Sequence, residues 1–140
     1  MLPEIWGESA WDFIHFVTLG YPENPTDDDK ERYYQYFHAL KYVLPCGKCR
    51  NNMSQHLKKN PLSDEVLSSR QSLVKWGIDL HNIVNYYTGK TMLSYTEAMT
   101  EINNKINKKS TKNNFWYYSF LLIAIIIIVY MIYFCFIKNK

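Results

Sequence analysis

The sequence predicts an all-α protein: a four-helix bundle with a short fifth helix, followed by one C-terminal transmembrane helix. Three observations predict this fold. Apolar residues recur at helical spacing through most of the first hundred positions, whereas no stretch alternates apolar and polar residues as a half-buried strand does. Positions 115–137 form an apolar run of 23 residues without charge or proline.

The first two helices have clear start and stop signals. The first is expected over residues 3–19, because apolar residues there share one helical face and Gly20 follows them. Thr26 is placed as the N-cap of the second helix, and three aspartates follow it where the helix dipole favours negative charge. This helix stops at Pro45, which cannot continue it.

Three further helical segments follow. A third helix is expected over about residues 46–59 and a fourth over about residues 69–88, with Gly89 as its C-terminal stop. The sequence "SYTE" at residues 94–97 is a capping box that opens a short fifth helix. The catalytic or binding domain is therefore expected to span residues 1–101.

The C-terminal quarter of the chain predicts a membrane anchor. Residues 102–114 lose helical periodicity and form a basic polar linker. Residues 115–137 are long enough to cross a hydrocarbon core of about 30 Å as a helix, and residues 138–140 form a short basic tail. A span this near the C-terminus indicates tail-anchored insertion into a membrane, with residues 1–114 in the cytosol.

Charge is distributed unevenly along the chain. The formal net charge is +3, but residues 1–101 carry a local net charge of −3. Residues 102–140 contain six lysines and no acidic residue, so the basic excess lies beside the predicted membrane span, where it can meet anionic headgroups. Nucleic-acid binding by the folded part is therefore disfavoured.

The pair Cys46 and Cys49 leaves three interpretations open. A zinc site needs four ligands, usually two pairs, and no second Cys-x-x-Cys or His-x-x-x-His precedes the membrane span. A redox-active disulfide is favoured because Pro45 places both cysteines in the first turn of a helix. Free backbone N–H groups, Lys48 and Arg50 can stabilise a thiolate there. Two unreactive thiols are the third possibility.

Two helices carry polar stripes that predict a pocket between them. In helices, residues three or four apart lie on one face or on adjacent parts of it, so each stripe points to one side of its helix. A histidine and two asparagines in an apolar helix need hydrogen-bond partners if they are buried, and a mid-helix glycine suits the close approach of a flat or bulky group. The stripes consist of Gly7, Trp11 and His15 in the first helix and His81, Asn82 and Asn85 in the fourth.

Three segments together resemble a known family. "WGESAWDFIHFVTLGYP", "LPCGKCRNNM" and "LVKWGIDLHNIVNYYTGK" resemble, in order and approximate spacing, the Erv/ALR FAD-linked sulfhydryl oxidases. The resemblance covers about residues 5–95, and its specific parts are Gly-x-x-x-Trp-x-x-x-His and His-Asn-x-Val-Asn. The short chain with three cysteines looks most like the compact members of large DNA viruses, so the resemblance implies a viral or virion membrane as a host for the anchor. The resemblance implies FAD at the mouth of the bundle and a homodimer.

The resemblance also implies residue roles. Cys49 would lie beside the isoalloxazine ring of FAD, and Cys46 would be the more exposed cysteine that substrate attacks. The implied activity forms disulfides in dithiol proteins and passes electrons through FAD to oxygen, giving hydrogen peroxide. The implied cofactor residues are Gly7, Trp11 and His15 along the flavin, Tyr42 bordering the ring, Trp76, His81, Asn82 and Asn85 at the adenine and ribose end, and Lys90 near the pyrophosphate or ribose.

The sequence departs from the family in two respects. Cellular members usually carry an additional shuttle pair of cysteines, whereas the third cysteine here, Cys135, lies in the apolar run. We therefore expect direct exchange with a separate dithiol protein, such as a thioredoxin- or glutaredoxin-like carrier. Glu8 stands where many members have arginine. The contact that this arginine makes with the cofactor is therefore not carried over to Glu8. The competing interpretation is a membrane-anchored binding or structural protein with a zinc-bound or architectural Cys-x-x-Cys.

Overall fold

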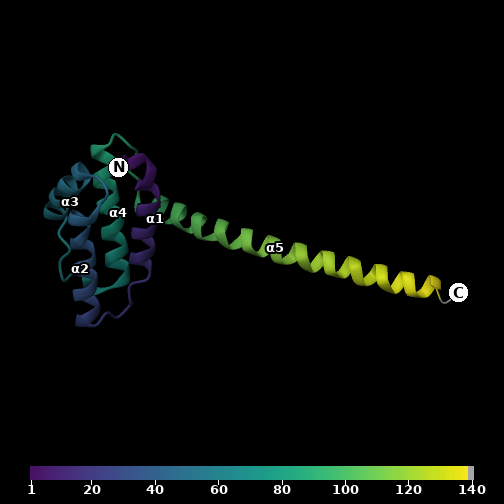
Figure 1. Cartoon of the computed structure of the whole chain (residues 1–140). Helices are drawn as coiled ribbons and strands as arrows, with labels where there is room; N and C mark the ends of the chain where they lie inside the picture. The colour runs from purple at the N-terminus through teal and green to yellow at the C-terminus, as the bar shows by residue number, and fades with distance from the viewer. Residues whose placement is uncertain (139–140) are drawn as a thin grey trace. The chain divides into compact units, whose positions relative to one another are not determined.

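All the regular secondary structure is helical in the part of the chain that this computed structural model describes. It describes residues 1–138, with side chains described except at positions 109–115, 136 and 138, so residues 139 and 140 of the predicted tail lie outside it. By their internal contacts, residues 1–99 and 100–140 form two separate units. The elements in Figure 1 are α1 (Pro3–Leu19), α2 (Asp27–Val43), α3 (Gly47–Lys59), a 3₁₀ turn η1 (Val66–Ser68), α4 (Arg70–Tyr87) and α5 (Tyr95–Lys138).

The helix termini follow the capping signals of the sequence. The Thr26 hydroxyl accepts a hydrogen bond from the Asp29 backbone N–H at 3.2 Å, and the Asp29 carboxylate accepts one from the Thr26 N–H at 2.9 Å. Ser94 and Glu97 exchange the same two hydrogen bonds at the start of α5. Gly89, just after α4, has a φ of +71°, a conformation that glycine adopts without steric cost.

The four helices of the first unit enclose one main core. α1 packs against α4, α2 packs against α3, and α3 also contacts α4. Close packing of α1 on α4 depends on Gly77, where a Cβ would lie 3.1 Å from Cγ2 of the fully buried Thr18. The all-α bundle predicted from the sequence is therefore confirmed. The buried core residues are Ile14, Tyr21, Phe37, Leu40, Leu44, Met53, Leu57, Leu62, Leu67, Leu73, Trp76 and Leu80.

The fifth helix differs from the prediction. Its backbone is helical without interruption from Tyr95 to Lys138, so the predicted short helix, polar linker and apolar span are parts of one helix. The segment contains neither proline nor glycine, and lysine is a good helix former, so loss of apolar periodicity does not end the helix. Within it, Trp116–Cys135 is long and apolar enough to cross a membrane, by length and composition.

Candidate active site

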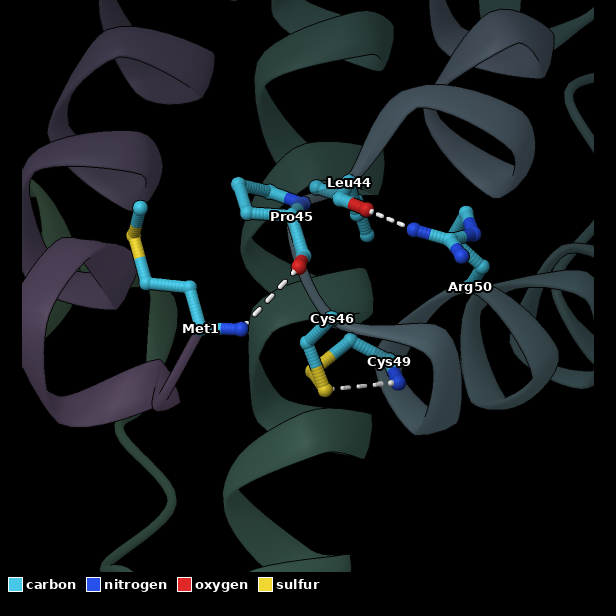
Figure 2. Close-up of a disulfide and its surroundings, with 6 residues drawn as sticks. All are labelled: Met1, Leu44, Pro45, Cys46, Cys49 and Arg50. Carbon is cyan, nitrogen blue, oxygen red and sulfur yellow. Dashed lines mark hydrogen bonds between the residues drawn. A yellow bond between two sulfur atoms is a disulfide. The ribbon is translucent and has the colours of Figure 1, made fainter.

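The two neighbouring cysteines form a disulfide at the N-terminus of α3. α2 ends at Val43, and the chain then bends at Leu44 and Pro45 before Cys46, which has extended backbone angles and is the N-cap of α3. Cys46 and Cys49 are disulfide-bonded, and their Cα atoms lie 5.0 Å apart. The backbone N–H of Cys49 also donates a hydrogen bond to Sγ of Cys46 at 3.2 Å (Figure 2). The pair is thus placed where helix N–H groups can stabilise a thiolate.

The surroundings of the two cysteines differ. Both side chains are half-buried, but Cys49 packs against the core cluster. The Arg50 guanidinium donates a hydrogen bond to the carbonyl oxygen of Leu44 at 2.6 Å, across the base of the cysteine loop. The ammonium group of Met1 lies 3.4 Å from the carbonyl oxygen of Pro45. Positive charge therefore approaches the segment before Cys46 from two elements (Figure 2).

The polar stripes of α1 and α4, between which the sequence predicts a pocket, are in direct contact. Nε2 of His15 and Nδ1 of His81 lie 2.9 Å apart and share a hydrogen bond. The Trp11 ring stacks on the His81 ring with centroids 4.1 Å apart and planes within 8°. His15 is buried, so the polar cluster lies between the two helices rather than on their solvent faces.

One turn before this cluster, α1 leaves room for a flat group. A Cβ at Gly7 would meet no atom within 4 Å. The indole N–H of Trp6 is buried, and it has no hydrogen-bond partner among the described residues. An open helix surface beside a buried donor fits an aromatic ring that carries acceptor atoms, as the isoalloxazine of FAD does. The sequence pattern pointed to Gly7 but missed Trp6, whose position directly before that glycine was the available signal.

The asparagines of α4 have different surroundings. The Asn82 amide donates to the carbonyl oxygen of Leu93 at 2.7 Å and accepts from its N–H at 2.9 Å, so it fastens the segment between α4 and α5. Asn85 is buried at the C-terminal end of α4, and its carbonyl oxygen accepts the backbone N–H groups of Thr88 and Lys90. The sequence places these asparagines on adjacent parts of one face, whereas the Asn82 side chain is directed to the Leu93 backbone.

Trp76 and Tyr42 lie in contrasting environments. Trp76 is 2% exposed, packs edge-on against Phe37, and donates its indole N–H to the carbonyl oxygen of Asn60 at 3.1 Å. Tyr42 is 72% exposed at the end of α2, and the Lys41 ammonium lies 5.1 Å from its ring centroid. Trp76 therefore lies on the core-facing side of α4. Tyr42 is exposed and can contact a group that binds beside the cysteine pair.

A separate hollow lies beside the C-terminal ends of α3 and α4. Its volume is about 550 Å³, and among the predicted cofactor residues it is lined by Asn82. Nearby, His56 is buried and stacks on Tyr87. Burial lowers the pKa of His56, and the positive charge of Lys59 lowers it further. The lining residues of the hollow are Lys59, Asn60, Asp79, Asn82, Ile83, Tyr86, Tyr87 and Met92.

Fold and site together define a class of protein. A small helical bundle carries a solvent-accessible disulfide at a helix N-terminus. A polar cluster lies between two of its helices, and the helix surface one turn before it has room for a planar group. Such a bundle is suited to thiol–disulfide exchange. The sequence matches the Erv1 / Alr family over residues 8–102, and the chain belongs to that family.

Individual relatives agree with the family match. The chain is 57% identical, over 118 residues, to an Acanthamoeba polyphaga mimivirus protein named "probable FAD-linked sulfhydryl oxidase"; the match covers 84% of this chain and 82% of the relative. The crystal structure of the yeast Erv1 core is similar at 28% identity with a TM-score of 0.62, covering 67% of this chain and 77% of the other. The FAD-binding domain of Erv1 from Saccharomyces cerevisiae is similar at 29% identity with the same TM-score, covering 67% and 87%.

Proposed function

We propose that this protein is a FAD-dependent sulfhydryl oxidase that forms disulfides in dithiol protein substrates. The observation that carries the proposal is the Cys46–Cys49 disulfide at the N-terminus of α3 in a chain of the Erv1 / Alr family. A half-buried disulfide at a helix start is open to a substrate thiolate. The same position stabilises the thiolate that leaves.

The exchange steps follow from the two cysteines. A substrate thiolate attacks Sγ of Cys46, the S–S bond breaks, and the electron pair of that bond stays on Cys49 as a thiolate. The second thiol of the substrate then attacks the mixed disulfide and releases Cys46. When bound, FAD would supply the acceptor for the electron pair of the two cysteines; the pair and two protons would then reduce oxygen to hydrogen peroxide. Re-formation of the Cys46–Cys49 bond completes the cycle.

The residues between α1 and α4 would hold the cofactor. Gly7 provides a surface that a ring can approach, and the Trp6 N–H offers a donor. Tyr42 would border the ring from α2. Trp76 would hold α4 in place through its core contacts, and Asn82 would hold the segment after α4 through its hydrogen bonds to Leu93. The residues proposed for direct contact with FAD are Gly7, Trp11, His15, His81, Asn85 and Lys90.

Residues 115–137 would anchor the enzyme in a membrane. The support is the apolar segment Trp116–Cys135, which has a mean hydropathy of 2.5 and follows a lysine-rich stretch. We propose that residues 1–101 form the catalytic domain and face the cytosol, where a dithiol carrier of the thioredoxin or glutaredoxin kind can reach Cys46. Protease treatment of intact membranes should therefore remove the domain from the cytosolic side, and protection of the domain would refute this orientation.

A homodimer is supported by apolar residues on the surface of α1. Ile5 is 71% exposed and Phe13 is 59% exposed, and Phe16 is also exposed. A second copy could cover them, because exposed apolar surface commonly marks an interface. Sedimentation of the detergent-solubilised chain should give a dimer. A monomer at micromolar concentration would contradict this part of the proposal.

One purification tests the function itself. The full-length protein in detergent should be yellow, and it should consume oxygen with dithiothreitol. Cys46→Ser and Cys49→Ser should each stop turnover while FAD stays bound. A folded, colourless protein that does not take up added FAD would refute the proposal, and stoichiometric zinc in that protein would favour the structural alternative.

A further inference from the structure

The side chain of Arg50 spans the base of the cysteine loop. Arg50 follows Cys49 on α3, and its Nη1 donates a 2.6 Å hydrogen bond back to the carbonyl oxygen of Leu44 (Figure 2). Its backbone N–H donates to the carbonyl oxygen of Cys46 at 3.0 Å. Leu44 is buried in the core, so the carbonyl that Arg50 binds is fixed to the bundle.

This contact matters most when the disulfide is open. The segment between α2 and α3 bends at Leu44 and Pro45, with a ψ of 139° at Leu44 and 124° at Cys46, and Leu44 makes the last hydrogen bond of α2. Reduction removes the S–S bond that ties Cys46 to Cys49. The guanidinium bond to Leu44 then remains as a side-chain link across the loop, and it limits the conformations that the reduced loop can explore.

We propose that Arg50 is a positioning residue that holds Cys46 near Cys49 in the reduced state, so that the disulfide re-forms without a conformational search. The inference rests on the proposed function for its role in turnover. Its physical basis is the loop closure itself, because a link that restricts the open loop makes closure less costly in entropy. Arg50 thereby makes the disulfide harder to reduce.

A purely electrostatic role would have the opposite sign. A positive charge near the helix N-terminus stabilises thiolates and hence the reduced pair, so it makes the disulfide easier to reduce. Removing the charge would then lower the reduction potential, whereas removing the link raises it. The direction of the shift in Arg50→Gln therefore separates positioning from charge.

The test is the redox equilibrium of the full-length protein in detergent, without oxygen. Two glutathione thiols reduce the Cys46–Cys49 disulfide to the dithiol and become glutathione disulfide, so two electrons and two protons pass to the cysteines. After alkylation, mass spectrometry of the peptide with both cysteines gives the reduced fraction. For Arg50→Gln we expect the equilibrium to move about tenfold toward the dithiol, which raises the reduction potential by about 30 mV for this two-electron couple.

Two further variants complete the design. Arg50→Lys keeps a donor that can reach the Leu44 carbonyl and should show a smaller rise than Arg50→Gln. Lys48→Gln removes a charge from the exposed first turn of α3 and should not raise the potential. An unchanged or lower potential in Arg50→Gln, or an equal rise in Lys48→Gln, would overturn the proposal. If Arg50→Gln does not melt cooperatively, the test rests on Arg50→Lys alone. A reduction potential of Arg50→Lys no higher than that of the unaltered protein would then overturn the proposal.

The equilibrium involves neither oxygen nor turnover. Absence of oxidase activity in the unaltered protein would therefore refute the proposed function and leave the Arg50 measurement valid. Conversely, an active oxidase with no upward shift would refute the positioning role alone.

Discussion

Replacing Gly7 with alanine should have opposite effects on the protein alone and on its complex with FAD. A Cβ at this position meets no atom within 4 Å, so the free protein accepts the methyl group without a clash. Alanine in a helix interior is more favourable than glycine by about 0.5–1 kcal/mol. Since 1 kcal/mol shifts the melting temperature of a domain this size by roughly 4–8 °C, the cofactor-free variant should melt about 2–8 °C higher.

The complex should be weaker for the same structural reason. If the flavin lies against α1 at Gly7, the added methyl group overpacks the contact, at a cost of about 1–3 kcal/mol. Because 1.4 kcal/mol corresponds to a tenfold change in a dissociation constant, FAD should bind roughly five- to 150-fold more weakly. One substitution therefore raises stability without FAD and lowers affinity for it.

The assay measures both quantities on the full-length protein. Thermal melting with and without added FAD gives the stability, and titration of the cofactor-free protein with FAD gives the dissociation constant. Gly77→Ala is the matched control, because its Cβ would lie 3.1 Å from Cγ2 of Thr18 and should lower stability by up to about 2 kcal/mol with or without FAD. Unchanged FAD affinity in Gly7→Ala would refute the close approach of the cofactor at this glycine.

Three other substitutions test local features of the bundle. Asn82→Ala removes two hydrogen bonds to Leu93 and should lower the free energy of unfolding in urea by about 1–3 kcal/mol, so a loss below about 0.5 kcal/mol would contradict the fastening role. The lowered pKa of His56 means that the unfolded state takes up its proton first. Stability should therefore be full above about pH 6.5, the ordinary value, and fall as the pH drops below it; melting curves from pH 5 to 8 should show a smaller fall for His56→Phe. Gly89→Ala should cost about 1–2 kcal/mol at its φ of +71°, and an unchanged melting temperature would contradict this.

Helix positions could be predicted well because their signals are local. The first helix was expected over residues 3–19 and is found there, since a proline at its start and Gly20 at its end act within a few residues. The capping box at Thr26 works in the same way. The fifth helix was predicted less well, because a loss of apolar periodicity removes a packing face without breaking backbone hydrogen bonds.

The site could be predicted only in part, because side-chain partners depend on tertiary contacts. Helical spacing placed His15 and His81 on stripes that were expected to line one pocket, and the structure brings the two rings within hydrogen-bond distance. Spacing could not show that the Asn82 amide binds the backbone of Leu93, eleven residues away on a connecting segment. Nor could it show that Arg50, recognised from its charge alone, reaches back to the Leu44 carbonyl.

The different environments of Cys46 and Cys49 support different roles even though both side chains are half-buried. Cys46 precedes α3, and its sulfur accepts the N–H of Cys49, so it lies at the helix end where an incoming thiolate can approach. Cys49 lies within the helix and packs against the core, which restricts its motion. An exchange reaction needs one sulfur that substrate can reach and one that stays fixed relative to the electron acceptor. The N-cap position of Cys46 and the core contact of Cys49 meet these two requirements separately, so the proposed substrate attack at Cys46 would leave the electron pair on the sulfur that the bundle holds in place.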